Sequence, residues 1–163
     1  MNVYRRGRRS GAQSGPASYP IRTSLNPSNP TRILLAAAPV SLEPLELAIG
    51  PGFTRSVARN MAQAKAELMH PFHLVVCGLY FDDSRMFDLL RHVKAEASTR
   101  ATPFLAVKAS SGQLRAPLLQ GVEIACAALG AERFVELSEW VRRDGQMAAH
   151  TRFRSLISRI LAA

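Results

Sequence analysis

Two adjacent carboxylates follow the most apolar run of this chain. The run HLVVCG ends at Gly78, and Asp82 and Asp83 lie four and five residues beyond it. Paired carboxylates can hold a divalent cation, because Mg²⁺ prefers several convergent oxygen ligands. They can equally cap the helix that follows, where a carboxylate at the positive helix end contributes about 0.5–2 kcal/mol. We favour the capping role, since two neighbouring acids alone make a poor magnesium site.

The other reactive residue types form no catalytic pattern. The four histidines, at positions 70, 73, 92 and 150, lack the HExxH spacing of a zinc site, and no GxSxG, GxGxxG or GxxxxGK motif occurs. Cys77 has no evident base near it in sequence, and Cys77 and Cys126 both lie in apolar runs. We therefore predict buried free thiols, no catalytic residue, no metal and no cofactor. Free thiols also favour a reducing compartment, the cytoplasm.

The positive charge is concentrated at the two ends of the chain. The net charge is +9, yet residues 33–137 hold ten basic and ten acidic side chains. Residues 1–32 hold six arginines and no acid, and residues 138–163 hold five arginines and two acids. No apolar stretch approaches the ~20 residues that cross a bilayer, and no apolar segment follows the basic start as in a cleaved leader.

The first thirty residues differ in composition from the rest. Residues 1–30 are rich in Gly, Ser, Pro, Asn and Arg and lack hydrophobic periodicity, so we predict a disordered basic arm. Residues 31–163 are predicted to form one folded domain. The arm has a possible role in nucleic-acid binding, by counterion release at Arg5, Arg6, Arg8 and Arg9. A solubilising role is the interpretation that we favour.

Short apolar runs alternate with helical patterns from residue 31 onward. The predicted strands are residues 33–38, 53–59, 72–77, 103–107 and 133–137. The predicted helices are residues 41–49 with Ser41 as cap, 61–69, one that Asp83 or Ser84 caps, 113–129, and one or two more that break near Gly145. In the helix at 113–129, one apolar face is shared by Leu118, Leu119, Val122, Cys126 and Leu129. This alternation predicts a doubly wound α/β fold: five parallel strands with helices on both faces. The carboxyl ends of such strands line the functional crevice, and Gly78 ends there.

With this order of elements, the chain resembles the receiver domain of bacterial response regulators, which has a flavodoxin-like fold. The resemblance covers about residues 31–137, and the stretches that carry it are RILLAAAPV, HLVVCGLYFDDSRMFDLLRHVK, PFLAVKAS and GAERFVEL. It implies a protein of two-component signal transduction that receives a phosphoryl group in a phosphorelay.

The residues that a working receiver needs are missing. The resemblance implies an acceptor aspartate after the third strand, an acid pair for Mg²⁺ after the first, a hydroxyl after the fourth and a lysine after the fifth. These positions fall on Gly78, on Ala37 and Ala38, on Lys108 and on Leu137. Lys108 either fills the empty pocket with a fixed positive charge or, as we favour, extends to solvent. The chain is therefore interpreted as a pseudo-receiver with a degenerate phosphorylation pocket. Whether Asp82 or Asp83 rebuilds the site stays open.

Three hypotheses for function follow. The first is a phosphorylation-independent module that binds a signalling protein or a second copy of itself. The last helices supply its candidate interaction surface, although we expect their apolar stripe to dock on the chain's own sheet: Arg142, Arg143, Arg152, Phe153, Arg154, Leu156, Ile157, Arg159 and Ile160. The second hypothesis is non-specific nucleic-acid binding by the arm and the last helix. The third is a small-ligand or nucleotide site in the crevice, which only the fold class supports.

Overall fold

The computed structural model describes residues 29–112 and 114–163. Residues 1–28 hold nearly all of the predicted basic arm, so the predictions made for Arg5, Arg6, Arg8 and Arg9 lie outside the described residues.

Five parallel strands form one sheet in the order β2-β1-β3-β4-β5. The strands are β1 (Arg32–Ala36), β2 (Thr54–Ala58), β3 (Leu74–Gly78), β4 (Phe104–Lys108) and β5 (Arg133–Glu136). The three central strands are buried along nearly their whole length, because helices cover both faces of the sheet. The predicted doubly wound fold is confirmed. Its strand order reverses between β1 and β3, so the topological switch point lies at the carboxyl ends of these two strands.

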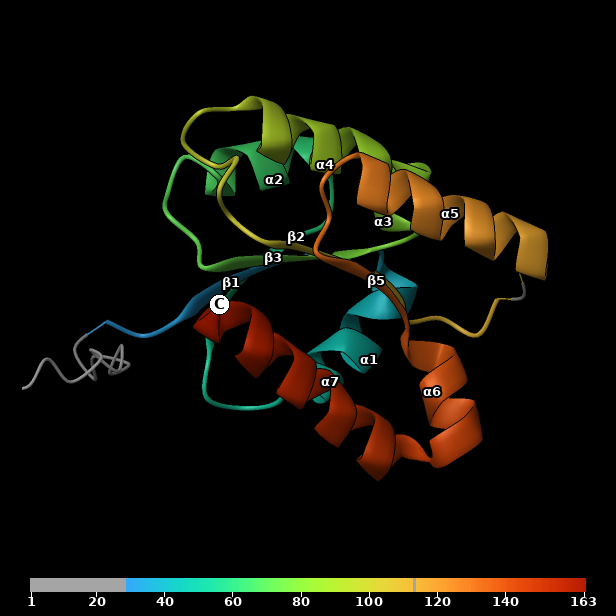
Figure 1. Ribbon diagram of the computed structural model, residues 1–163. Coiled ribbons are helices and arrows are strands. Elements are labelled where there is room, and N and C mark those ends of the chain that lie inside the picture. The colour runs from blue at the N-terminus through green and yellow to red at the C-terminus, as the bar shows by residue number, and fades with distance from the viewer. Residues whose placement is uncertain (1–28, 113) are drawn as a thin grey trace, which may run out of the picture.

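The helices form two layers around the sheet. They are α1 (Pro39–Ile49), α2 (Met61–Glu67), α3 (Phe81–Ser84), α4 (Met86–Ala95), α5 (Ala116–Ala128), α6 (Leu137–Asp144) and α7 (Gln146–Ala162). Helices α2 to α5 lie on one face of the sheet, and α1, α6 and α7 lie on the other (Figure 1). Each face has its own apolar core, one around Phe81 and Phe104 and the other around Leu45 and Phe153. None of the helices in the described ranges is long and apolar enough to cross a membrane.

Helix α1 starts earlier than the sequence indicated. Ala38 occupies the N-cap position and Pro39 the first turn, where a missing N–H costs nothing, while Ser41 is buried inside the helix. The prediction that Ser41 caps this helix is therefore wrong. The predicted end is confirmed, because Gly50 closes the helix with a φ of 71° that favours glycine.

The turn between α3 and α4 departs most from the prediction. Helix α4 begins at Met86 with Arg85 at its N-cap position, so the prediction that Asp83 or Ser84 caps it is wrong. Asp82, Asp83 and Ser84 have φ values of 43°, 55° and 66°, in the left-handed region that ends a right-handed helix. Aspartate tolerates this region better than most residues do, and the buried Phe81 anchors the turn in the core.

Helix α7 packs on the sheet and on α1. Its side chains Phe153 and Ile157 are 0% exposed and belong to the core that α1 shares. The guanidinium of Arg154 donates to the carbonyl oxygens of Ala48 (3.1 Å) and Leu47 (3.0 Å), at the end of α1. Those carbonyls have no partner within their own helix, so Arg154 supplies one. The expectation that the last helix docks on its own sheet is confirmed.

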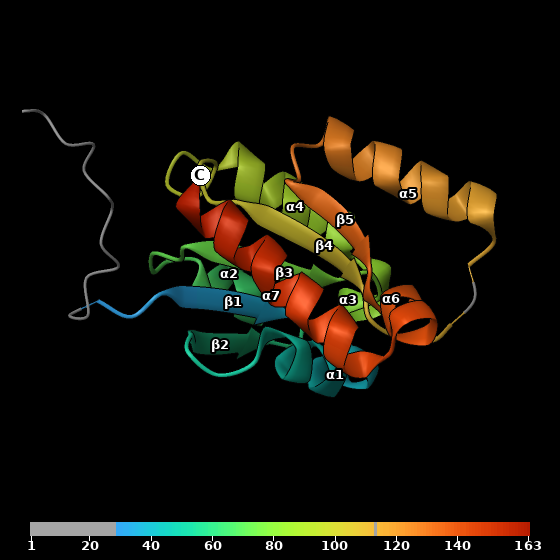
Figure 2. The same cartoon turned by 60° about the horizontal axis from the view of Figure 1, so that its bottom comes forward.

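Helix α5 is attached much more loosely. Cys126 is its only buried residue in the described structure, and Leu118 and Ile124 are 58% and 62% exposed. The helix extends past the end of β5, away from the other helices (Figures 1 and 2). The prediction that Leu118 shares the buried face with Cys126 is therefore wrong.

Candidate functional site

The carboxyl ends of β1 and β3 meet where the sequence predicted a degenerate phosphorylation pocket. Gly78 is the last residue of β3 and pairs with Val107 of β4. A Cβ on Gly78 would lie 3.8 Å from the Ala37 Cα and 3.6 Å from the Ser41 Cβ, which are ordinary van der Waals distances. The structure thus brings Gly78 and Ala37 together and leaves room for a small side chain between them.

The residues at this switch point do not fit Mg²⁺. Ala37 and Ala38 carry only methyl groups, and the Ala38 carbonyl already accepts the N–H groups of Ser41 and Leu42 at 2.9 and 3.1 Å. Mg²⁺ takes near-octahedral oxygen ligands, commonly with one or two carboxylates, and positions 37, 38 and 78 supply no carboxylate. Across the described ranges, no group of three or more His, Cys, Asp or Glu side chains is placed to hold a metal ion.

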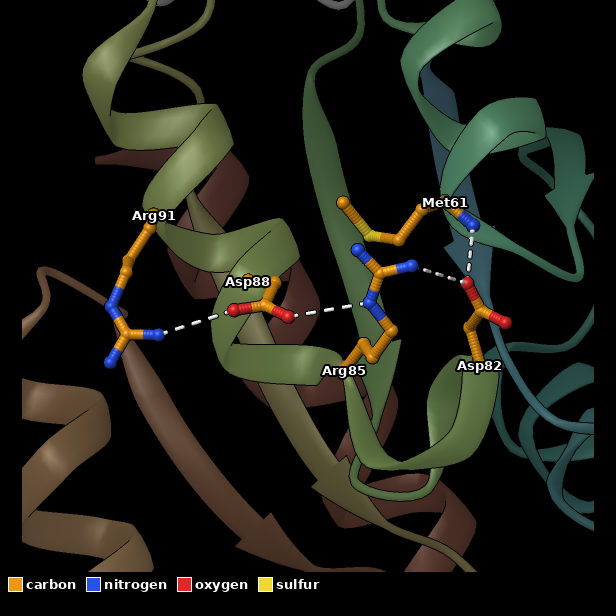
Figure 3. Close-up of polar contacts among 5 residues, drawn as sticks. All are labelled: Met61, Asp82, Arg85, Asp88 and Arg91. Carbon is orange, nitrogen blue, oxygen red and sulfur yellow. Dashed lines mark hydrogen bonds and ion pairs between the residues drawn. The ribbon is translucent and has the colours of Figure 1, made fainter.

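Asp82 has a structural role that explains the unusual turn. Its carboxylate accepts the backbone N–H of Met61 at 2.9 Å, and Arg85 lies 3.5 Å from the same oxygen. Arg85 continues to Asp88, and Asp88 to Arg91, as a chain of exposed ion pairs (Figure 3). The acid was predicted to cap the helix after it. Instead it satisfies the first N–H of α2, which lies 21 residues earlier in sequence. Asp83 is exposed on the same turn.

Lys108 is the charged residue that the strand ends bury. It is 6% exposed, and its Nζ donates to the carbonyl of Ser110 (3.0 Å) and to the hydroxyl of Ser138 (3.1 Å). The favoured expectation that Lys108 extends to solvent is therefore wrong, because the ammonium finds acceptors inside the protein. Its contacts run toward α6 rather than toward Gly78. They fasten the loop after β4 to the first turn of α6.

The position corresponding to the receiver lysine lies in a helix. Leu137 is the first residue of α6 and is 1% exposed in the core on the α7 side of the sheet. Its neighbour Ser138 supplies the hydroxyl that Lys108 binds. Sequence reasoning missed Ser138, since a serine 30 residues from its partner gives no local signal.

A pocket of about 260 Å³ opens beside Lys108. Ser111 and Gly112 of the polar loop after β4 line it, together with Ser138. Two cations, Lys108 and Arg142, face it alongside two carboxylates, Glu136 and Glu139. Arg142 pairs with Glu139, and this hydrogen bond, aided by the nearby cations, lowers the pKa of Glu139. Because the charges balance, the pocket shows no preference for an anion.

The predicted interaction surface on α6 and α7 is only partly a surface. Phe153, Leu156 and Ile157 are buried in the core, so including them was wrong; Ile160 is half-buried. Most of the arginines already have partners within the chain. Arg142 pairs with Glu139, and Arg143 and Arg152 pair with Asp144. The guanidinium of Arg152 also lies 3.9 Å from the ring centre of Trp140, and Arg154 binds α1. Arg159 lies exposed near the end of α7.

Both cysteines are buried free thiols, as predicted. Burial raises the pKa of Cys77 well above its usual value and that of Cys126 to about 11, so both are protonated near neutral pH. A thiol without its thiolate is a poor nucleophile, and Cys77 therefore offers no chemistry at the crevice.

The chain resembles solved structures of response regulators and receiver domains. The sequence matches no protein-family model and no curated protein. A response regulator from Chloroflexus aurantiacus superposes with a TM-score of 0.63 at 18% identity, over 83% of this chain and 100% of that one. The phosphorylated cyanobacterial phytochrome response regulator RcpA gives 0.61 at 10% identity, over 78% and 91% of the two chains. The receiver domain of a histidine kinase from Syntrophus aciditrophicus gives 0.54 at 21% identity, over 79% and 93%.

The chain has the receiver fold. In this chain, Gly78 and Ala37 occupy the switch point between β1 and β3. At these low identities the likeness establishes the fold, whereas the chemistry of the site has to be judged from the residues present.

Proposed function

We propose that this protein is a pseudo-receiver: a module of two-component signal transduction that binds another protein and accepts no phosphoryl group. The observation that carries the proposal is the side-chain content of the switch point. Phosphoryl transfer to a receiver needs a carboxylate nucleophile and a metal held by acids. Gly78, Ala37 and Ala38 provide neither, and Asp82 is engaged by Met61 and Arg85.

The contacts of Lys108 support a fixed conformation for this module. Phosphorylation-driven switching requires an element with two arrangements that the phosphate biases. In this chain a buried ammonium joins the loop after β4 to α6 through two hydrogen bonds, without any phosphate. The proposed role is therefore constant binding rather than catalysis, in a reducing compartment such as the cytoplasm, where the buried thiols persist.

Nucleic-acid binding is less well supported by the folded part. Most of the arginines of α6 and α7 already bind carboxylates, a ring or backbone carbonyls. That hypothesis now depends on the N-terminal arginines, and a strong salt dependence of retention on DNA would support it.

The test is an amide NMR titration of the full chain with Mg²⁺ and beryllofluoride, a mimic of the phosphoryl group. We expect no saturable shift at Gly78, Ala38 or Lys108. The matched control is the triple variant Ala37→Asp/Ala38→Asp/Gly78→Asp, which restores three carboxylates in a space that admits a side chain at position 78. Shifts in the variant alone would support the proposal, whereas saturable shifts in the unmodified chain would refute it.

A further inference from the structure

The free edge of the sheet forms a groove. β5 is the last strand of the sheet, so within residues 29–112 and 114–163 one of its long sides has no neighbouring strand. A cavity of about 440 Å³ runs along β5, with Glu123 and Ala127 of α5 on one side and Trp140 of α6 on the other. An unpaired strand edge offers backbone hydrogen-bonding groups to any extended segment that reaches it.

The groove is acidic on a protein that is otherwise basic. Three carboxylates line it, those of Glu123, Glu132 and Glu136, against the single cation Arg133. None of these three takes part in an ion pair among the residues that the structure describes. Residues 29–163 as a whole carry sixteen basic and twelve acidic side chains. A surplus of carboxylates at this one place therefore favours a basic occupant.

The groove also has aromatic walls. Phe134 and Trp140 both line it, and Trp140 already carries the guanidinium of Arg152 at 3.9 Å from its ring centre. Aromatic faces attract cations, and arginine is the side chain that stacks best on them. The walls and the carboxylates thus favour the same chemistry, an arginine-rich segment.

The chain itself contains such a segment. Residues 1–28, called the N-terminal segment here, hold five arginines, at positions 5, 6, 8, 9 and 22, and no acid. The segment joins the domain at the start of β1, and β5 starts at the same edge of the parallel sheet, three strand spacings away, or about 14 Å. Arg22 and Arg32 are ten residues apart, and ten residues can reach at most about 33 Å when fully extended. Reaching the groove therefore requires no unusual extension.

We propose that the N-terminal segment docks along β5 in the groove between α5 and α6 of its own molecule. Its guanidinium groups pair with Glu123, Glu132 and Glu136, and the segment covers the free strand edge. An external partner that uses this surface has to displace it. This inference does not depend on the proposed function, because it concerns a different surface from the switch point.

The test uses a spin label in the full chain. A cysteine introduced by Ser10→Cys is labelled with a nitroxide in a Cys77→Ala/Cys126→Ala background, so that the two native thiols cannot take the label, and mass spectrometry verifies a single label. We expect selective broadening of the amide signals of residues 132–136 and of the facing part of α5. The broadening should disappear in 0.5 M salt, because exposed charge pairs are screened.

Two variants decide between docking and chance proximity. Glu123→Lys/Glu132→Lys reverses two exposed charges of the groove and should abolish the broadening. Glu43→Lys/Glu67→Lys changes the net charge equally on other elements and should leave it unchanged. Equal loss in both variants, broadening spread over the whole surface, or broadening that increases with protein concentration would overturn the proposal. The last result would indicate that a second copy occupies the groove.

Discussion

Helices α5 and α7 are the two longest of the described structure, and they are held in opposite ways. Helix α7 contains three arginines, yet it buries Ala149, Phe153, Leu156 and Ile157. Helix α5 contains only one charged residue, Glu123, yet it buries Cys126 alone. Apolar composition therefore does not decide which helix is fixed to the sheet.

The difference lies in the neighbours of each helix. Helix α7 has α1 beside it and Arg154 tied to the end of that helix, whereas α5 stands over the last strand, where the sheet stops. An apolar helix at such an edge keeps exposed surface that a partner can cover. We expect α7 to govern the stability of the domain and α5 to govern its binding, and the following experiments test that division.

The largest effect is expected in the core under α7. Phe153→Ala removes a fully buried ring and should lower the free energy of unfolding by about 3–5 kcal/mol, measured by urea denaturation. Ile124→Ala on α5 is the matched control and should change it by less than about 0.5 kcal/mol, because Ile124 is 62% exposed. Comparable losses would contradict the division.

A smaller effect is expected from the contact between α7 and α1. Arg154→Ala removes two charge-assisted hydrogen bonds to the last carbonyls of α1 and should cost about 1–2 kcal/mol. Arg159→Ala, an exposed arginine of the same helix, should cost less than about 0.5 kcal/mol in the same denaturation assay. If the two variants unfold alike, Arg154 does not hold α1.

Thiol labelling can show how α5 moves. Cys126 lies on α5 and Cys77 lies in the central strand β3, and both are buried. Loosely packed elements open locally at lower free energy than the core does. Iodoacetamide at pH 8 should therefore label Cys126 at least about tenfold faster than Cys77, as read by mass spectrometry. Equal rates would mean that α5 opens only with the whole domain.

The smallest effect is a pH dependence that arises in α7. Partial burial, with Arg154 nearby, lowers the pKa of His150, so the unfolded chain binds this proton more readily than the folded one. Its contribution to stability is full above about pH 6.5 and falls as the pH drops through and below that value. Denaturation midpoints between pH 7.5 and 5.5 should decline less steeply in His150→Gln. Parallel declines would remove His150 as the cause.

Local patterns predicted the strands well and the charged side chains poorly. The buried strands of a parallel sheet are continuous apolar runs in the sequence. Gly78, Ala37 and Ala38 were predicted to follow or end such strands, and they lie at the strand ends in the structure. The partners of Asp82 and Lys108 could not be predicted. They lie 21 and 30 residues away in sequence, at Met61 and Ser138, and come together only through the fold. The exposure of Leu118 could not be predicted either. Which strand forms the edge of the sheet is decided only when the strands assemble.

The contact between Arg154 and α1 also has a consequence for the time course of synthesis. Arg154 lies 106 residues after Ala48, so the face of the sheet that α1 occupies stays uncovered until α7 has left the ribosome. At translation rates of about 5–20 residues per second, that interval lasts roughly 5–20 s. During this time the apolar side chains of β1, β3 and α1 on that face lack the cover of α7, and we expect the nascent chain to bind chaperones before it binds any partner.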